Sequence, residues 1–298
     1  MNNNIMNDGR TPVHIAKFDN LDDFLNYVRD EKVSYLFKNH LHSISGDMEF
    51  TGTRSYKDAW NLCRYTMNEG FSDFAEKFDS LQYYIDLEER KVNNNSVYGY
   101  LPNVPRFLLN IPTSMHSYQM EKNNPTIHIY MNYGYEAMTS IDAVRNRGVI
   151  VLSLIQYLEK KGFNVNFYGF DLGYTRSHSE GLFVEIPMKK EYEKINLKLL
   201  YFPLVHPSFL RRLLFRVTEK MPLTSDEWLN GYGVPATYEE SVKFIKNYRK
   251  QFDSNDIIFI STPNELKIYG NNLKDDYDRA ISIINKKYNI NDCIKRRH

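Results

Sequence analysis

Apolar residues recur along the second half of the chain in patterns that predict strands and helices in alternation. Segment 126–132 is a run of mostly apolar, β-branched and aromatic residues, typical of a buried strand. Helical spacing of apolar residues follows over about 136–161 and ends at Gly162. The same reasoning predicts strands at 163–170, 181–188, 197–204 and 256–261, and helices at 207–220, 238–252 and 273–288. This order is typical of an open α/β sheet with helices on both faces.

The first 90 residues show helical spacing instead. Apolar residues three and four apart predict a helix over about 21–30, capped by Asn20. Two further helices are predicted, one that Thr53 or Ser55 caps and an aromatic-rich one over 71–90. Over 91–124 the periodicity fails, and four prolines in or next to this stretch exclude long helices. The sequence therefore predicts a mostly helical N-terminal region over 1–90, a proline-rich connection over 91–124 and an α/β domain over 125–298.

The composition indicates a folded protein without a bias towards polyanions. Hydrophobic residues make up 42% and charged residues 25% of the chain, as in globular proteins. Lys and Arg number 38 against 37 Asp and Glu, so a nucleic-acid surface would have to be a local patch. Cys63 and Cys293 form neither a disulfide framework nor a metal-ligand pair. With no signal-peptide pattern and no long apolar run, we expect a protein of the cytosol, or of a particle assembled there, without a membrane partner.

Recognisable catalytic and cofactor motifs are absent from the sequence, so we predict no catalytic residue and no cofactor. The nucleophile elbow, the zinc-protease helix, the phosphate-binding loop and the dinucleotide fingerprint do not occur. His40 and His42 are two apart but lack a third ligand nearby. His128 lies in the middle of a predicted strand, where a hydrogen-bonded core histidine is expected.

Two resemblances extend this interpretation. Residues 126–290 resemble a von Willebrand factor A-like domain, in which the ends of two strands normally carry the residues of a metal site. Here Asn132, Gly134 and Glu136 stand for the first motif and Pro263 for the second aspartate, so the resemblance implies a fold without its metal site.

The whole chain also looks like an uncharacterised group of phage-encoded proteins. This second resemblance is carried by three short motifs, 50–55 leading into Ala59, 102–106 and 145–148. It implies a protein of the host cytoplasm, or one incorporated in the virion.

Ligands of open α/β sheets bind beyond the carboxyl ends of the strands, which predicts the position of a partner-binding rim. The candidate residues are Asn132, Tyr133, Tyr135, Glu136, Asp171, Ser261, Thr262, Asn264 and Glu265. The alternative is that these residues only turn the chain and cap helices. Three of them, Glu136, Asp171 and Glu265, could also serve an unrecognised hydrolase.

Arginines offer a further set of candidate contacts. Arg145 and Arg147 cannot both face the core of one helix, so we expect at least one of them to be exposed or paired, in a salt bridge or as a clamp for an acidic group. The possible nucleic-acid contacts are Arg211, Arg212, Arg216, Lys295, Arg296 and Arg297. The alternative for the first three is a solvated helix edge.

Taken together, the sequence favours a non-catalytic protein-binding module of a phage, acting in assembly or as an inhibitor of a host factor. A nucleic-acid-binding accessory protein is the first alternative, and a hydrolase is the second.

Overall fold

The computed structural model describes most of the chain. The described residues are 4–29, 32–39, 41–45, 47–88, 95–96, 101–102, 104–109, 115–116, 124–136, 138–253 and 256–288.

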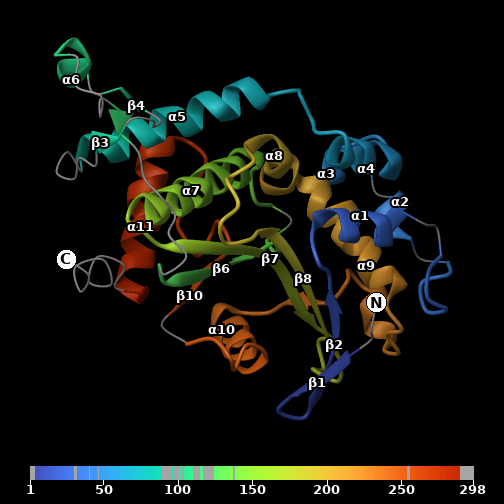
Figure 1. The fold of residues 1–298 in the computed structure, drawn as a ribbon. Helices are drawn as coiled ribbons and strands as arrows, with labels where there is room; N and C mark the ends of the chain where they lie inside the picture. The colour runs from blue at the N-terminus through green and yellow to red at the C-terminus, as the bar shows by residue number, and fades with distance from the viewer. Residues whose placement is uncertain are drawn as a thin grey trace.

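A mixed sheet organises the described residues (Figure 1). Its strands follow the order β1 (Asn4–Asp8), β2 (Thr11–Lys17), β8 (Gly181–Lys189), β7 (Asn164–Tyr174), β6 (Thr126–Asn132) and β10 (Ile257–Ile260), and β9 (Val234–Pro235) pairs with the end of β7. The pairs β10–β6, β6–β7 and β2–β8 are parallel, whereas β1–β2 and β7–β8 are antiparallel. The α/β class predicted from the sequence is thus confirmed.

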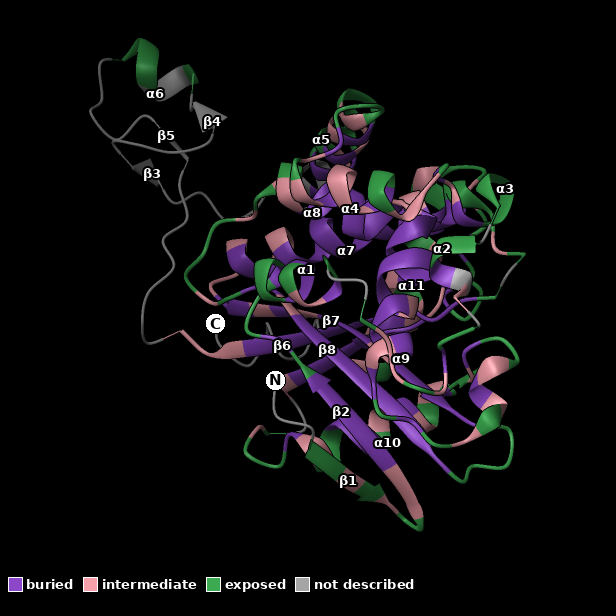
Figure 2. Cartoon of the chain, turned by 90° about the vertical axis from the view of Figure 1, so that its right-hand side faces the viewer, coloured by how far each residue is buried: buried purple, intermediate pink, exposed green. Residues whose placement is uncertain are grey.

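Strand β6, between β7 and β10, is buried on both of its faces. Ile127, Ile129 and Met131 point into the larger core cluster, and Tyr130 points into the smaller cluster on the opposite face. Parallel strands covered on both sides require such continuous burial. Figure 2 shows the contrast with the exposed edge strand β1.

Most described helices pack on one face of the sheet. The larger core cluster draws on α1 (Leu21–Arg29), α4 (Tyr56–Arg64), α5 (Phe71–Glu88), α7 (Ile141–Lys160), α8 (Leu197–Val205), the π-helical segment η1 (Phe209–Leu214), α9 (Phe215–Lys220) and α11 (Leu273–Tyr288). Helix α10 (Tyr238–Tyr248) covers the other face with Phe244 and Ile245 (Figure 1). Shorter helices are α2 (His42–Ser45), α3 (Met48–Thr51) and η2 (Asp226–Leu229).

Helix starts follow the capping residues expected from the sequence. Asn20 Oδ1 accepts from the Asp23 amide at 2.9 Å at the start of α1, and Ser55 Oγ accepts from the Asp58 amide at 3.1 Å at the start of α4. Ser140 caps α7 through the Ala143 amide, at 3.1 Å, so this helix begins later than the pattern predicted.

The strand predicted at 197–204 is wrong, because this segment is helix α8. Asn196 caps it by accepting from the Leu199 amide at 3.1 Å, and its middle and end are buried. A short apolar run buried on all sides has no periodicity that separates a strand from a helix. Packing against α7 and α5 therefore decides the conformation.

The N-terminal region also departs from its predicted, mostly helical character. Residues 4–8 and 11–17 form β1 and β2, and β2 pairs in parallel with β8, from Val13 opposite Gly181 to Lys17 opposite Glu185. The predicted boundary at residue 90 is therefore not a boundary of the sheet.

The proline-rich connection over 91–124 falls largely outside the described residues. Its described pieces are β3 (Asn95–Ser96), β4 (Leu101–Pro102), β5 (Met115–His116) and the short helix α6 (Val104–Leu108), with β5 paired antiparallel to both β3 and β4.

Candidate functional site

The chain changes direction across the sheet at β6. From β6 it passes through α7 to β7 on one side, and β10 later pairs with β6 on the other side. Such a switch point leaves a crevice beyond the carboxyl ends of the two strands, where ligands of open α/β sheets bind. In this protein that position, the switch-point region, comprises segments 133–136, 138–140 and 261–272, where the sequence placed most of its candidate rim.

Arg147 of α7 is buried at the switch point. Its side chain is 1% exposed, and its Nη1 donates to the carbonyl oxygens of Asn132 and Ser261 at 2.8 and 3.4 Å. One guanidinium thus joins the ends of β6 and β10. Burial lowers the pKa of Arg147 to about 10, against the opposing influence of Tyr135 and Tyr133, so the side chain stays charged at neutral pH.

Tyr133 and Tyr135, expected as contact residues on the rim, lie in the interior. The ring of Tyr133 packs on Phe209, with 4.8 Å between centroids, and crosses Gly169 so closely that an added Cβ there would stand 2.2 Å from Tyr133 Cε2. The Arg147 Cζ lies 5.8 Å from the centroid of the Tyr135 ring. Both tyrosines are therefore buried side chains and not exposed anchors.

The remaining rim residues divide into buried and exposed groups. Asn132 and Ser261 are buried, and Asn132 Oδ1 accepts from the Gly134 amide at 2.8 Å. Glu136, Asn264 and Glu265 are exposed. Glu265 also caps its own turn, because its Oε2 accepts from the Thr262 amide and hydroxyl at 3.3 Å.

Asp171 of β7 lies close to Gly134. Burial raises its pKa to about 6, and its Oδ1 would stand 3.3 Å from a Cβ added to Gly134. Within the described ranges, no hydrogen bond or ion pair joins Asp171 to Glu136 or Glu265. The three carboxylates proposed for a hydrolase are thus not joined by direct contacts.

Three exposed apolar side chains lie on the segments of the switch-point region. Met138 is 92% exposed, Tyr269 55% and Ile141 46%. Their segments adjoin, because a Cβ on Gly270 would meet the Ala143 backbone nitrogen at 2.6 Å, and Gly270 needs its positive φ of 85° there. The sequence analysis did not select these three residues. The one signal in the sequence is a methionine, Met138, two residues before the helix cap Ser140.

The basic helix candidates are buried, so the alternative of a solvated helix edge for Arg211, Arg212 and Arg216 is wrong. Arg211 donates to the Phe50 carbonyl at 2.5 Å, and Arg216 pairs with Glu219 at 3.0 Å. Arg212 is fully buried and binds residues 43, 44 and 53. Buried side chains with these partners are not placed to reach phosphates. Lys295, Arg296 and Arg297 lie outside the described residues.

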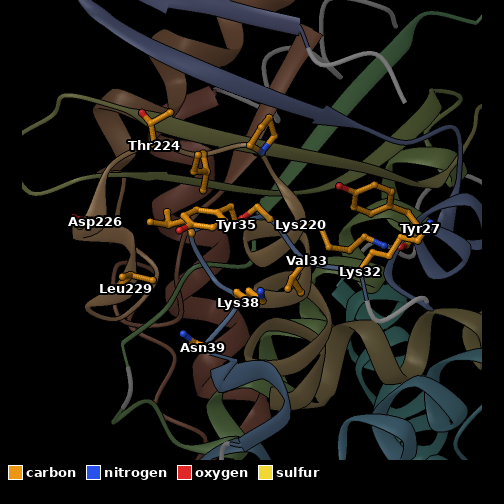
Figure 3. Close-up of a pocket in the computed structure, with 14 residues that line it drawn as sticks. Tyr27, Lys32, Val33, Tyr35, Lys38, Asn39, Lys220, Thr224, Asp226 and Leu229 are labelled. Atoms are coloured by element: carbon orange, nitrogen blue, oxygen red, sulfur yellow. Dashed lines mark hydrogen bonds between the residues drawn. The ribbon is translucent and has the colours of Figure 1, made fainter.

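A hollow of about 1190 Å³ opens between segments 32–39 and 220–229 (Figure 3). Three lysines line it, Lys32, Lys38 and Lys220, beside one carboxylate, Asp226. Lys220 Nζ lies 4.5 Å from the centroid of the Tyr27 ring, and Tyr35 is almost fully exposed at the mouth. Positive charge and aromatic rings are therefore combined in this hollow.

Metal-binding clusters and membrane-spanning helices are both absent from the described part of the chain. No group of three or more His, Cys, Asp or Glu side chains there is placed to hold a metal ion. Among the helices of the same part, none has the length and apolar character to span a membrane.

A family model for a domain of unknown function, DUF7192, matches residues 3–288. The chain belongs to the DUF7192 family. In this DUF7192 protein the matched region begins before β1 and ends with α11. It therefore includes all segments of the switch-point region. Comparison with curated proteins and with solved structures found no match.

Proposed function

We propose that this protein binds another protein, without catalysis, through the exposed side chains of the switch-point region. The observation that carries the proposal is the exposure of three apolar side chains at the switch point. We define the rim surface as Glu136, Met138, Ile141, Asn264, Glu265 and Tyr269. Exposed apolar residues with polar neighbours are typical of protein-interaction surfaces, in which methionine and tyrosine are enriched.

The rim surface has a firm support, which favours recognition with little loss of entropy. Ser140 caps α7 directly beneath it, and Arg147 joins the two strand ends. On the other side, Arg279 holds the loop that carries Tyr269, since it donates to the Lys267 carbonyl at 2.8 Å and lies 5.0 Å from the Tyr269 ring. Preorganised contact residues reduce the entropic cost of binding.

Charge indicates the kind of partner. Glu136 and Glu265 contribute two exposed carboxylates beside the apolar group. A complementary partner presents an apolar pocket with lysine or arginine at its margin. In the phage context implied by the resemblance, that partner would be a host factor or a phage assembly protein in the host cytoplasm or the virion.

A von Willebrand A-like fold forms part of the same proposal. It is supported by the order β8–β7–β6–β10, in which α7 crosses from β6 to β7 and the strand order reverses at β6. Strands β1 and β2 would then be an addition at the far edge, beyond β8.

The test compares variants of the rim surface with a matched control. Met138→Ser and Tyr269→Ser should each weaken binding to a partner isolated with the wild-type protein by about tenfold or more, since anchors typically contribute about 1.4 kcal/mol or more. Tyr83→Ser, a change of an equally exposed tyrosine on α5, should leave the affinity unchanged. Calorimetric titration gives the dissociation constants, and thermal melting checks that all variants fold. Wild-type affinity in both folded rim variants would refute the proposal.

A second candidate function, binding of single-stranded nucleic acid, is favoured by the hollow between segments 32–39 and 220–229. Its lysines supply positive charge for phosphates, and the exposed Tyr35 ring offers a surface on which a base can stack. The hydrolase alternative with Glu136, Asp171 and Glu265 stays a prediction without a structural contact in its favour.

A further inference from the structure

Arg147 uses only one of its three guanidinium nitrogens. Nη1 binds the two carbonyl oxygens at the strand ends, whereas Nε and Nη2 are buried and have no hydrogen-bond partner among the described residues. Nε and Nη2 form one edge of the guanidinium, and their parallel N–H groups match the two oxygens of a carboxylate. No ion pair joins Arg147 to an acidic side chain anywhere in the described ranges.

Two further donors at the same place also lack acceptors. The hydroxyls of Tyr133 and Tyr135 are buried, and neither has a hydrogen-bond partner within the part of the chain that is described. Burial raises the pKa of both hydroxyls more strongly than the charge of Arg147 lowers it, so both keep their protons at neutral pH. Both tyrosines lie near the guanidinium, because Arg147 Cζ is 5.8 Å from the centroid of the Tyr135 ring and Tyr133 directly follows Asn132, whose carbonyl binds Arg147 Nη1.

Four buried N–H and O–H groups thus gather without an acceptor. Buried polar groups are nearly always paired in native proteins, and each unpaired one destabilises the fold. A single unpaired arginine can have a local explanation, but an arginine edge with two tyrosine hydroxyls beside it indicates an acceptor that comes from outside the chain.

The geometry points to a binding site for a small carboxylate at the Nε–Nη2 edge of Arg147, with Tyr133 and Tyr135 as additional donors. The two oxygens of a carboxylate match the two guanidinium donors, and their remaining lone pairs accept from the phenols. One negative charge also balances the charge of Arg147, which has no ionic partner among the described residues. A phosphate dianion fits less well, because the second cation near Tyr135, Arg211, already stacks on Phe50 at 4.3 Å and donates to its carbonyl.

This site is separate from the rim surface and does not depend on a protein partner. It lies among buried residues, where charged hydrogen bonds are stronger because the local dielectric constant is low. The proposed ligand is therefore a free small molecule with a carboxylate group and not a side chain of the docking protein.

Thermal melting in sodium acetate and sodium formate, against sodium chloride at equal ionic strength, tests the inference. A carboxylate that binds only the folded protein raises the melting temperature with concentration, by about 5 to 10 °C at a hundredfold excess over its dissociation constant. We expect this rise for the wild type and for Arg145→Met, which removes a half-buried arginine from the same helix. We expect no rise for Arg147→Met.

Tyr135→Phe keeps the inference testable if Arg147→Met does not fold. This change removes a hydroxyl that has no partner in the described chain, so the melting temperature in chloride should stay near that of the wild type. The acetate dissociation constant should rise about tenfold, for the loss of one hydrogen bond to a charged group. The inference is overturned if the wild type does not distinguish acetate and formate from chloride, if phosphate alone stabilises it, or if Tyr135→Phe binds acetate as the wild type does.

Discussion

Replacing Arg212 by methionine removes the most extensively bound of the buried arginines on η1. Its Nε and Nη2 donate to Thr53 Oγ1 and the Thr53 carbonyl, both at 2.8 Å, and its Nη1 donates to the carbonyls of Ser43 and Ile44 at 2.8 and 3.1 Å. These bonds connect η1 to the segments around α2 and α3. Methionine fills a similar volume but offers no donor.

The expected loss follows from the acceptors that are left behind. The Thr53 carbonyl keeps a bond from the Thr51 hydroxyl at 3.1 Å, whereas the carbonyls of Ser43 and Ile44 lose the arginine donors. A buried acceptor without a partner costs about 1–3 kcal/mol. Part of this cost is offset because a buried charge also disappears. We therefore expect a loss of about 3 kcal/mol in the free energy of unfolding, or about 6–12 °C in melting temperature.

Urea unfolding followed by tryptophan fluorescence measures this loss. The midpoint should fall while the slope of the transition stays constant. Arg145→Met is the matched control, because the Arg145 side chain is 44% exposed and pairs with the exposed Asp142 at 3.5 Å; it should change stability by about 1 kcal/mol or less. A change of about 0.5 kcal/mol or less in Arg212→Met would refute the structural role of this arginine and return it to the nucleic-acid hypothesis.

Two further predictions concern other parts of the molecule. His128 is buried on β6 and stacks on Phe252 at 3.6 Å; burial, with a smaller effect of the Arg249 charge, lowers its pKa from 6.5 to about 4. The unfolded chain therefore binds an extra proton between these pH values. As the pH falls from 6.5 to 4, the wild type should lose stability relative to His128→Phe by about 1.4 kcal/mol per pH unit, measured by urea unfolding. Parallel pH profiles of the two proteins would contradict this. If the basic hollow binds single-stranded nucleic acid, Lys32→Gln with Lys38→Gln should reduce the slope of log affinity against log salt by about 1.4, in fluorescence anisotropy with an oligonucleotide, whereas the exposed Lys17→Gln should not. The nucleic-acid hypothesis fails if the double variant keeps the wild-type slope.

Local sequence patterns were sufficient for much of the sheet and for several helices. Strand β6 and helix α7 have the two periodicities that burial imposes, and residues such as Asn20, Ser55 and Gly162 act within a few positions of themselves. The hairpin of β7 and β8 was also predicted, since its strands are close in the chain. In each case the physical cause of the structure is contained in neighbouring residues.

Elements whose partners are distant in sequence were missed. Strand β1 is polar and largely exposed, and β2 gains its order from β8, so neither has a strong local signal. Arg211 and Arg212 looked solvated because adjacent residues diverge around a helix, but η1 is enclosed by α2, α3 and α4 and is buried on all sides. The burial of Tyr133 required knowledge of the space above Gly169 on β7. Arg147 could be recognised only in part, because the sequence excluded that both Arg145 and Arg147 face the core but did not identify which of them is buried.

The position of β2 in the sheet also affects when this strand can complete its pairing during synthesis of the protein. His14 and its partner Glu180 are 166 residues apart in the chain, and the strand that pairs with β2 begins at Gly181. At about 5–20 residues per second, the ribosome takes roughly 10 to 30 s to produce that partner. During this time β2, with its apolar residues Val13 and Ile15, has only β1 as a neighbouring strand. Strand β2 must therefore wait for the middle of the chain, and a nascent chain interrupted before β8 would present one unpaired edge of β2 to chaperones or to other chains.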